Sequence, residues 1–103
     1  MSLNKINITV AGATGYVGLD LIKILSSHPR ARIKYLCAQK NIGKNIQFFD
    51  KRIKKRLPKI SNLKNVNWNE VDLLFCSFHQ GNSHVLHELR VLQKSVVFYL
   101  SYK

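Results

Sequence analysis

Three glycines stand three residues apart near the start of the chain, within the stretch VAGATGYVGLDLIKIL (residues 10–25). An apolar run precedes them and a helix-like pattern follows, which is the setting that a dinucleotide-binding fingerprint requires. Gly12 would let the chain turn sharply out of a strand. Gly15 would let the backbone approach a pyrophosphate, and Gly18 would let a helix pack close to the strand. The spacing predicts a pyrophosphate-binding loop, with a plain tight turn that binds nothing as the competing interpretation.

Backbone amides at the start of the following helix would give this loop a partial positive charge. We expect the amides from about Thr14 to Val17, with Tyr16 between them, to face a bound anion. The dipole of the helix adds attraction at the same place. The hydroxyl group of Thr14 is a further donor, so the site would recognise a phosphate mostly through backbone atoms.

The residues after the second expected strand indicate which cofactor this loop would hold. An NAD-binding domain typically places Asp or Glu about 20 residues beyond the glycines, where the carboxylate binds the ribose 2′-hydroxyl. The matching stretch CAQKNIGK (residues 37–44) contains no acid and offers Gln39, Lys40 and Lys44 instead. Cations and a polar amide suit a 2′-phosphate, so the sequence favours NADP over NAD. The alternative is that these lysines simply belong to a generally basic surface.

A second loop with candidate functional side chains follows the third expected strand. Ser77 and His79 would lie at the carboxyl end of that strand, which is the edge where ligands bind in such sheets. No nucleophile or carboxylate partner is visible for His79, so we interpret it as lining the cofactor groove. His84 and His87 are three residues apart on an expected helix, but they lack a third ligand at useful spacing, and no metal site is predicted.

The two cysteines lie in apolar strand patterns. We expect Cys37 and Cys76 to be reduced, buried thiols with no nucleophilic role. No stretch approaches the roughly 18 apolar residues of a membrane span, and the first ten residues lack the apolar core of a secretory signal. The sequence therefore favours a cytoplasmic protein with no membrane partner.

The chain is strongly basic. Lysine and arginine total 17 against 5 acids, which gives a net charge of +12. Seven of these cations fall between Lys51 and Lys64, and such clustering can indicate a small basic module that binds nucleic acid or anionic lipid. The cations are mostly lysine and are not interleaved with stacking aromatic residues, so a compositional bias is the preferred explanation and nucleic acid is not the expected partner.

The order of the expected elements predicts the fold class. Strand patterns cover residues 5–11, 31–38, 70–78 and 95–100. One helical pattern begins at Tyr16, and a second covers residues 82–92. In the first helix, the spacing of Val17, Leu21, Ile24 and Leu25 predicts a buried face, which Leu19 and Ile22 widen. Such alternation indicates an α/β fold with a Rossmann-like, doubly wound parallel sheet. A doubly wound domain carries more elements than these, so we expect residues 1–103 to form part of an NAD(P)-binding domain, with the catalytic domain absent.

These motifs together resemble the amino-terminal part of N-acetyl-γ-glutamyl-phosphate reductase, a family within the semialdehyde dehydrogenase superfamily. The resemblance rests on VAGATGYVGLDLIKILSSHP (residues 10–29), where Tyr16 and the pair His28-Pro29 are typical of the family. The stretches KNIGKNI, VDLLFCSFHQGNS and VVFYLS support it. Two departures are visible: Phe78-His79-Gln80-Gly81 replaces a Pro-His-Gly loop, and Tyr99 replaces an aspartate. The pattern is lost after Ser101, which resembles a truncation.

The resemblance implies an enzyme of arginine biosynthesis. In that family a cysteine attacks N-acetylglutamyl 5-phosphate and expels phosphate, and NADPH reduces the resulting thioester to the semialdehyde while a histidine assists. Both residues would lie beyond residue 103, so no catalytic residue is assigned here and we expect this chain alone to be inactive. The complete enzyme would be a homo-oligomer. The alternatives are an aspartate-semialdehyde dehydrogenase-like NADP-binding domain and the basic nucleic-acid module. The residues that carry over to cofactor binding are Gly12, Thr14, Gly15, Tyr16, Val17, Gly18, Gln39, Lys40, Ser77 and His79.

Overall fold

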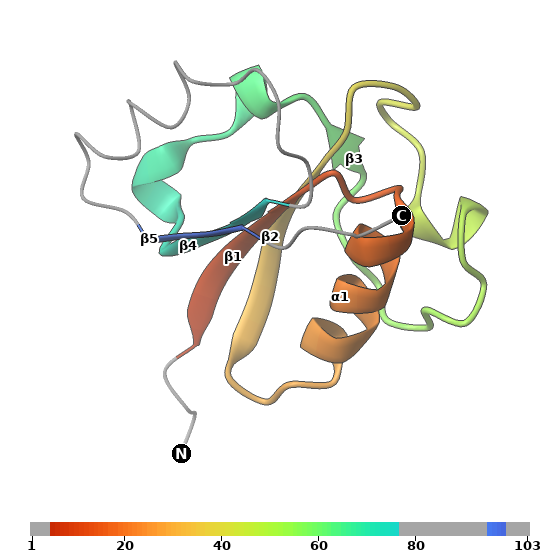
Figure 1. The fold of residues 1–103 in the computed structure, drawn as a ribbon, viewed down its shortest axis with the longest axis horizontal. Coiled ribbons are helices and arrows are strands. Elements are labelled where there is room, and N and C mark those ends of the chain that lie inside the picture. The colour runs from red at the N-terminus through yellow and green to blue at the C-terminus, as the bar shows by residue number, and fades with distance from the viewer. Residues whose placement is uncertain (1–4, 77–94, 99–103) are drawn as a thin grey trace.

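A computed structural model describes residues 5–76 and 95–98 and places five parallel strands in one sheet, in the order β3-β2-β1-β4-β5 (Figure 1). The strands are β1 (Ile6–Ala11), β2 (Ala31–Cys37), β3 (Ile60–Ser61), β4 (Leu73–Cys76) and β5 (Ser95–Phe98). The chain builds outward from β1 to β2 and β3, and then crosses back to place β4 and β5 on the other side. This order confirms the predicted Rossmann-like, doubly wound α/β fold.

Strand β1 is the centre of the sheet and is covered on both faces. Residues 8–11 are all buried, including Thr9, which lies between the alternating apolar positions that predicted the strand. The Cα of Ala11 is in register with Cys37 of β2 on one side and with Cys76 of β4 on the other. A strand with neighbours on both sides and cover on both faces is the expected position for the first strand of a parallel sheet.

Helix α1 (Tyr16–Ser26) connects β1 to β2 and covers one face of the sheet. Its buried residues are Gly18, Leu21, Ile22 and Leu25. Ile24 was expected on this face but is 62% exposed, because the helix rests on a narrower stripe than its apolar residues define. Backbone bonds from Ser27 to Ile24 and from His28 to Leu25 close the helix just before Pro29, as the sequence predicts.

Two apolar clusters fill the two faces of the sheet. The first joins α1 to β1 and β2 and to three isoleucines that follow β2, namely Ile46, Ile53 and Ile60. The second lies on the opposite face, where Trp68 and Val71 pack against Ala11, Cys37 and Cys76. Figure 1 shows the turns that carry this second cover on the side of the sheet away from α1. These turns are the 3₁₀ helices η2 (Leu63–Asn65) and η3 (Trp68–Glu70), and a further one, η1 (Ile46–Phe48), precedes the basic stretch.

One expected strand begins later than the sequence pattern suggests. The third expected strand, at 70–78, begins at Leu73, because residues 68–70 form a turn. The last expected strand is present as β5. The helix expected over residues 82–92 lies outside the described residues. Within the part of the chain that the structure describes, no helix has the length and apolar character needed to span a membrane.

Candidate cofactor-binding edge

The glycine loop leaves the carboxyl end of β1, the strand at which the sheet order reverses. On one side of β1 the chain runs to β2 and β3, and on the other side to β4 and β5. In open parallel sheets, ligands bind in the crevice at the carboxyl edge where such a reversal occurs. The loop and the ends of β2 and β4 therefore lie at the edge where sheets of this kind bind ligands.

Gly12 turns the chain out of the sheet, as predicted. Its φ angle is +79°, a left-handed backbone conformation that residues other than glycine rarely adopt. The amides of Gly12 and Ala13 both donate to the carbonyl oxygen of Cys37, at 2.9 and 3.0 Å. This pair of bonds fastens the loop to the end of β2. The sequence pattern does not predict this role of Cys37, because the acceptor is its backbone carbonyl oxygen and not its thiol.

Gly18 is required by a close contact within the protein. A Cβ at this position would overlap the carbonyl oxygen of Gly12 and crowd the backbone of Ala13. The prediction that Gly18 allows close packing is thus confirmed, and the structure shows that the partner is the turn at the end of β1. The first turn of α1 consequently lies directly on the loop that precedes it.

Gly15 differs from the other two glycines. Its φ angle is −81°, which any residue can adopt, and it is exposed. A Cβ built on it would approach only the carbonyl oxygen of Gly12, at 3.7 Å, which is an ordinary contact. No contact within the described protein requires glycine here. As far as the described residues show, the space in front of Gly15 can therefore accommodate a group that binds against the loop.

The start of α1 presents amides without an internal acceptor. The first helical bond runs from Leu19 to the carbonyl oxygen of Gly15, at 2.9 Å. Within the described residues, the amides of Thr14, Val17 and Gly18 have no hydrogen-bond acceptor. The first turn contains no acidic side chain, and no side chain caps it. The Tyr16 side chain is 85% exposed beside this end. Unsatisfied donors and the positive end of the helix dipole make this position suited to an anion.

Gln39 and Lys40 lie just past the end of β2, beside the glycine loop in the sheet order. Both are exposed, and Lys40 forms no ion pair with a described acidic side chain. The amide of Ala38 donates to the carbonyl oxygen of Ser61, so the segment leaves the sheet at a fixed point. Lys44 is held differently: its Nζ lies 4.1 Å from the centre of the Phe48 ring. Lys44 is nevertheless exposed, so both lysines can reach a ligand, and Lys40 is the one without such a contact among the described residues.

The remaining predicted site residues are Ser77 and His79, which lie outside the described residues. Both cysteines are free and buried, as predicted. Burial raises the pKa of the Cys37 thiol to about 11, so that thiol is neutral at ordinary pH and is a poor nucleophile. Within residues 5–76 and 95–98, the His, Cys, Asp and Glu side chains form no group of three that could hold a metal ion.

Comparison with known families decides what this fold belongs to. The family model for the NAD-binding domain of semialdehyde dehydrogenases matches residues 7–102. The chain belongs to this semialdehyde dehydrogenase family. N-acetyl-gamma-glutamyl-phosphate reductase from Ehrlichia ruminantium (strain Gardel) is 37% identical to this semialdehyde dehydrogenase domain over 82 residues, which is 78% of this chain and 24% of the relative. A probable chloroplastic N-acetyl-gamma-glutamyl-phosphate reductase from Oryza sativa subsp. japonica is 29% identical over 102 residues, with coverage of 93% and 25%. The chain thus spans about a quarter of the length of these curated relatives.

Solved structures support the same fold for this semialdehyde dehydrogenase domain. Aspartate semialdehyde dehydrogenase with NADP from Candida albicans aligns with a TM-score of 0.73 at 23% identity, over 95% of this chain and 30% of that one. GenD2 from gentamicin A biosynthesis, in complex with NAD, aligns with a TM-score of 0.66 at 12% identity, over 95% of this chain and 27% of that one. The family membership and the fold identify a nicotinamide dinucleotide as the cofactor class of this domain.

Proposed function

We propose that this chain is the amino-terminal cofactor-binding part of an NADP-dependent N-acetyl-γ-glutamyl-phosphate reductase. The complete enzyme would convert N-acetylglutamyl 5-phosphate to the 5-semialdehyde with release of phosphate, as a homo-oligomer in the cytoplasm. The observation that carries the proposal is the glycine loop at the sheet reversal, in a chain whose curated relatives bear this reductase name. The aspartate-semialdehyde dehydrogenase alternative has the support of the solved structures, but only at the level of fold.

In this proposal the pyrophosphate of the cofactor rests on the amides at the start of α1. Gly15 leaves room for it, Gly12 and Gly18 set the shape of the turn, and the amides of Thr14 and Val17 donate. The Tyr16 ring stands beside the same end of the helix. Ser77 and His79 would complete the groove after β4. When bound, the nicotinamide supplies hydride, while this part of the chain holds the dinucleotide in position.

Lys40 would select the phosphorylated cofactor. Its side chain is exposed just past β2, and residues 38–44 carry no acid that would bind a ribose 2′-hydroxyl. Gln39 would add a neutral donor next to it. A cation near a 2′-phosphate favours NADPH over NADH by direct attraction, and that attraction weakens as salt is added.

The test is a comparison of NADPH and NADH binding to the 103-residue chain by calorimetry. We expect NADPH to bind more tightly, and Lys40→Glu to reduce the preference by about tenfold, which corresponds to about 1.4 kcal/mol. Lys5→Glu is the matched control: Lys5 is also exposed but precedes β1, at the opposite end of that strand from the loop. A preference for NADH, or equal effects of the two substitutions, would contradict the assignment.

A second measurement tests the reductase assignment itself. The chain alone should show no phosphate-dependent reduction of NADP with N-acetylglutamate 5-semialdehyde, because the cysteine and histidine of the proposed reaction lie outside it. Replacing the corresponding quarter of the Ehrlichia relative with this chain should give an active enzyme that uses NADP. Turnover by the 103-residue chain alone would refute the proposal.

A further inference from the structure

The basic stretch before β3 forms a hollow that the cofactor assignment does not use. Its volume is about 620 Å³, which is within the usual range for small-molecule sites. Of the described residues, four cations line it, together with two amide side chains and a small apolar surface; the cations are Lys51, Lys54, Arg56 and Lys59. None of the lining residues belongs to the glycine loop or to the segment that carries Lys40.

This loop is anchored and is not simply a solvated run of lysines. Ile53 is buried in the cluster beneath α1. The Nε2 of Gln47 donates to the carbonyl oxygens of Ile53 and Lys55, at 3.0 and 2.9 Å, and so uses both of its hydrogens to hold the loop. At the start of the loop, Asp50 is buried and binds Arg52 and Lys23. A ligand would therefore meet cations on a backbone that is already ordered, which lowers the entropic cost of binding.

Within the part of the chain that the structure describes, acidic side chains do not balance the charge of the hollow. Asp50 is the sole acid between residues 45 and 69, and its carboxylate is already occupied by Arg52 and Lys23. Within the described residues, the four lining cations have no acidic side chain within ion-pair distance. All four are exposed. Unpaired like charges around a concave surface raise the local potential and attract anions.

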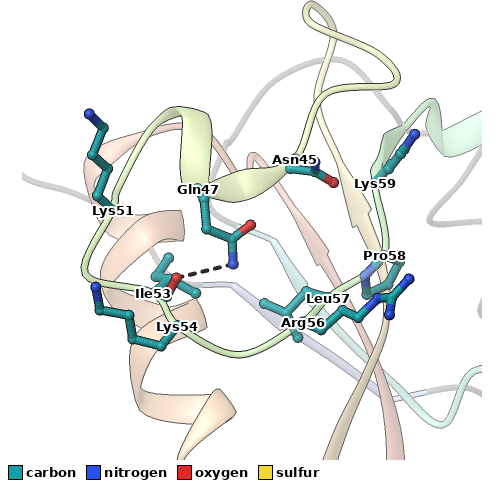
Figure 2. A pocket seen from close by; sticks show the side chains of 9 residues that line it. All are labelled: Asn45, Gln47, Lys51, Ile53, Lys54, Arg56, Leu57, Pro58 and Lys59. Carbon is teal, nitrogen blue, oxygen red and sulfur yellow. Dashed lines mark hydrogen bonds between the residues drawn. The ribbon is translucent and has the colours of Figure 1, made fainter.

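The arrangement of the cations indicates the size of the ligand. Figure 2 shows Lys51 and Lys54 on one side of the hollow and Arg56 and Lys59 on the other, with the Gln47 amide between them. The charged ends point outward from the two sides, so one small anion cannot contact all of them. A molecule with at least two anionic groups would reach both pairs, while its body would lie over the half-buried side chains of Leu57 and Pro58. Among the described residues, the lining contains no aromatic ring, which disfavours a surface that stacks nucleic-acid bases.

We propose that this hollow binds a small molecule carrying two or more phosphate groups, at a site separate from the cofactor. The paired cations, the ordered loop and the apolar floor together recognise such a ligand. Arg56 is suited to a phosphate through its planar donors, and the lysines act as point charges. Occupation of the hollow would also stabilise the segment between η1 and β3, and so the edge of the sheet.

Inorganic triphosphate is the probe for the test, because it carries the charge without a base or a nicotinamide. We expect saturable one-to-one binding to the 103-residue chain in calorimetry, and chemical-shift changes at backbone amides of residues 45–59. Lys54→Gln combined with Arg56→Gln should weaken binding at least about tenfold. The control pair, Lys5→Gln with Lys64→Gln, removes the same charge from exposed positions outside the lining and should change binding by less than about twofold.

Saturating NADPH should leave triphosphate binding unchanged, which separates this site from the cofactor loop. Equal weakening by the two double variants would overturn the proposal, since net charge alone would then explain binding. Displacement by NADPH, or shift changes at residues 12–18, would also overturn it by placing the anion in the cofactor site. Much tighter binding of single-stranded DNA or of anionic lipid vesicles at the same residues would replace the small ligand with a macromolecule. NADPH binding measured in the same samples tests the proposed function independently.

Discussion

The carbonyl oxygen of Gly12 occupies the place where a Cβ on Gly18 would stand. This contact links the turn after β1 to the first turn of α1, and it explains why two glycines six residues apart are needed together. Gly12 supplies a left-handed backbone angle, and Gly18 allows the helix to rest on the turn that this angle creates. Packing inside the protein thus fixes the geometry of the glycine loop, independently of any ligand.

Gly18→Ala should therefore destabilise the fold. The added methyl group meets backbone atoms, which cannot move aside as a flexible side chain can, and overpacking of this kind costs about 1–3 kcal/mol. The helix would have to shift away from the sheet, which would also disturb the amides at its start. Urea unfolding followed by circular dichroism measures the change. An unfolding free energy within about 0.5 kcal/mol of the parent chain would show that α1 does not lie on the Gly12 carbonyl.

Gly15→Ala should weaken cofactor binding while leaving the stability of the fold nearly unchanged. Its new methyl group makes only an ordinary contact and its backbone angle is permitted, so we expect the unfolding free energy to change by less than about 1 kcal/mol. In the proposed complex the same methyl group points into the space of the pyrophosphate, and NADPH binding should fall by at least about tenfold. Calorimetry on both glycine variants provides the comparison. If Gly15→Ala binds NADPH like the parent chain, the pyrophosphate does not rest against this residue.

How far the sequence predicts this molecule depends on whether a feature is local. β1, β2 and α1 follow from periodicity and from Pro29, since strand and helix patterns extend over six or more residues there. β3 has only two residues and no pattern of its own; it forms because Ile60 is buried beside β2. Ile24 fits the apolar stripe of α1 but lies outside the contact between α1 and the sheet. The partner of Gly18 and the carbonyl oxygen of Cys37 depend on the tertiary fold, which no single stretch specifies.

The ion pair that anchors the basic loop should make stability depend on acid pH. Hydrogen bonds from the Arg52 side chain and backbone, with the charges of Arg52 and Lys23, lower the pKa of the Asp50 carboxyl from 3.8 to about 2. A lowered folded-state pKa stabilises the fold above the unfolded value, and that stabilisation is lost as the pH falls from about 4 to about 2. Urea midpoints across this range measure the loss. Asp50→Asn should lose less stability over this range than the parent chain.

Asp20→Asn is the control for this experiment. Asp20 also lies near Lys23, at 3.4 Å, but its side chain is 70% exposed and it does not hold the loop. Its variant should keep the acid-dependent loss seen in the parent chain. If Asp50→Asn and the parent chain lose stability in parallel between about pH 4 and about pH 2, Asp50 does not anchor the loop to α1 in the way described.

Thiol labelling tests the interpretation that the described part of the chain holds no nucleophile. Cys37 is 1% exposed, and burial raises its pKa to about 11, so almost none of it is thiolate near neutral pH. Cys76 is 3% exposed on the same face of the sheet. With a chromogenic disulfide reagent at about pH 8, we expect both thiols to react at least about 100-fold more slowly in the folded chain than in denaturant. Rapid reaction of one thiol in the folded chain would point to an activated cysteine within these residues. The proposal that the nucleophile of the reductase lies outside this chain would then have to be abandoned.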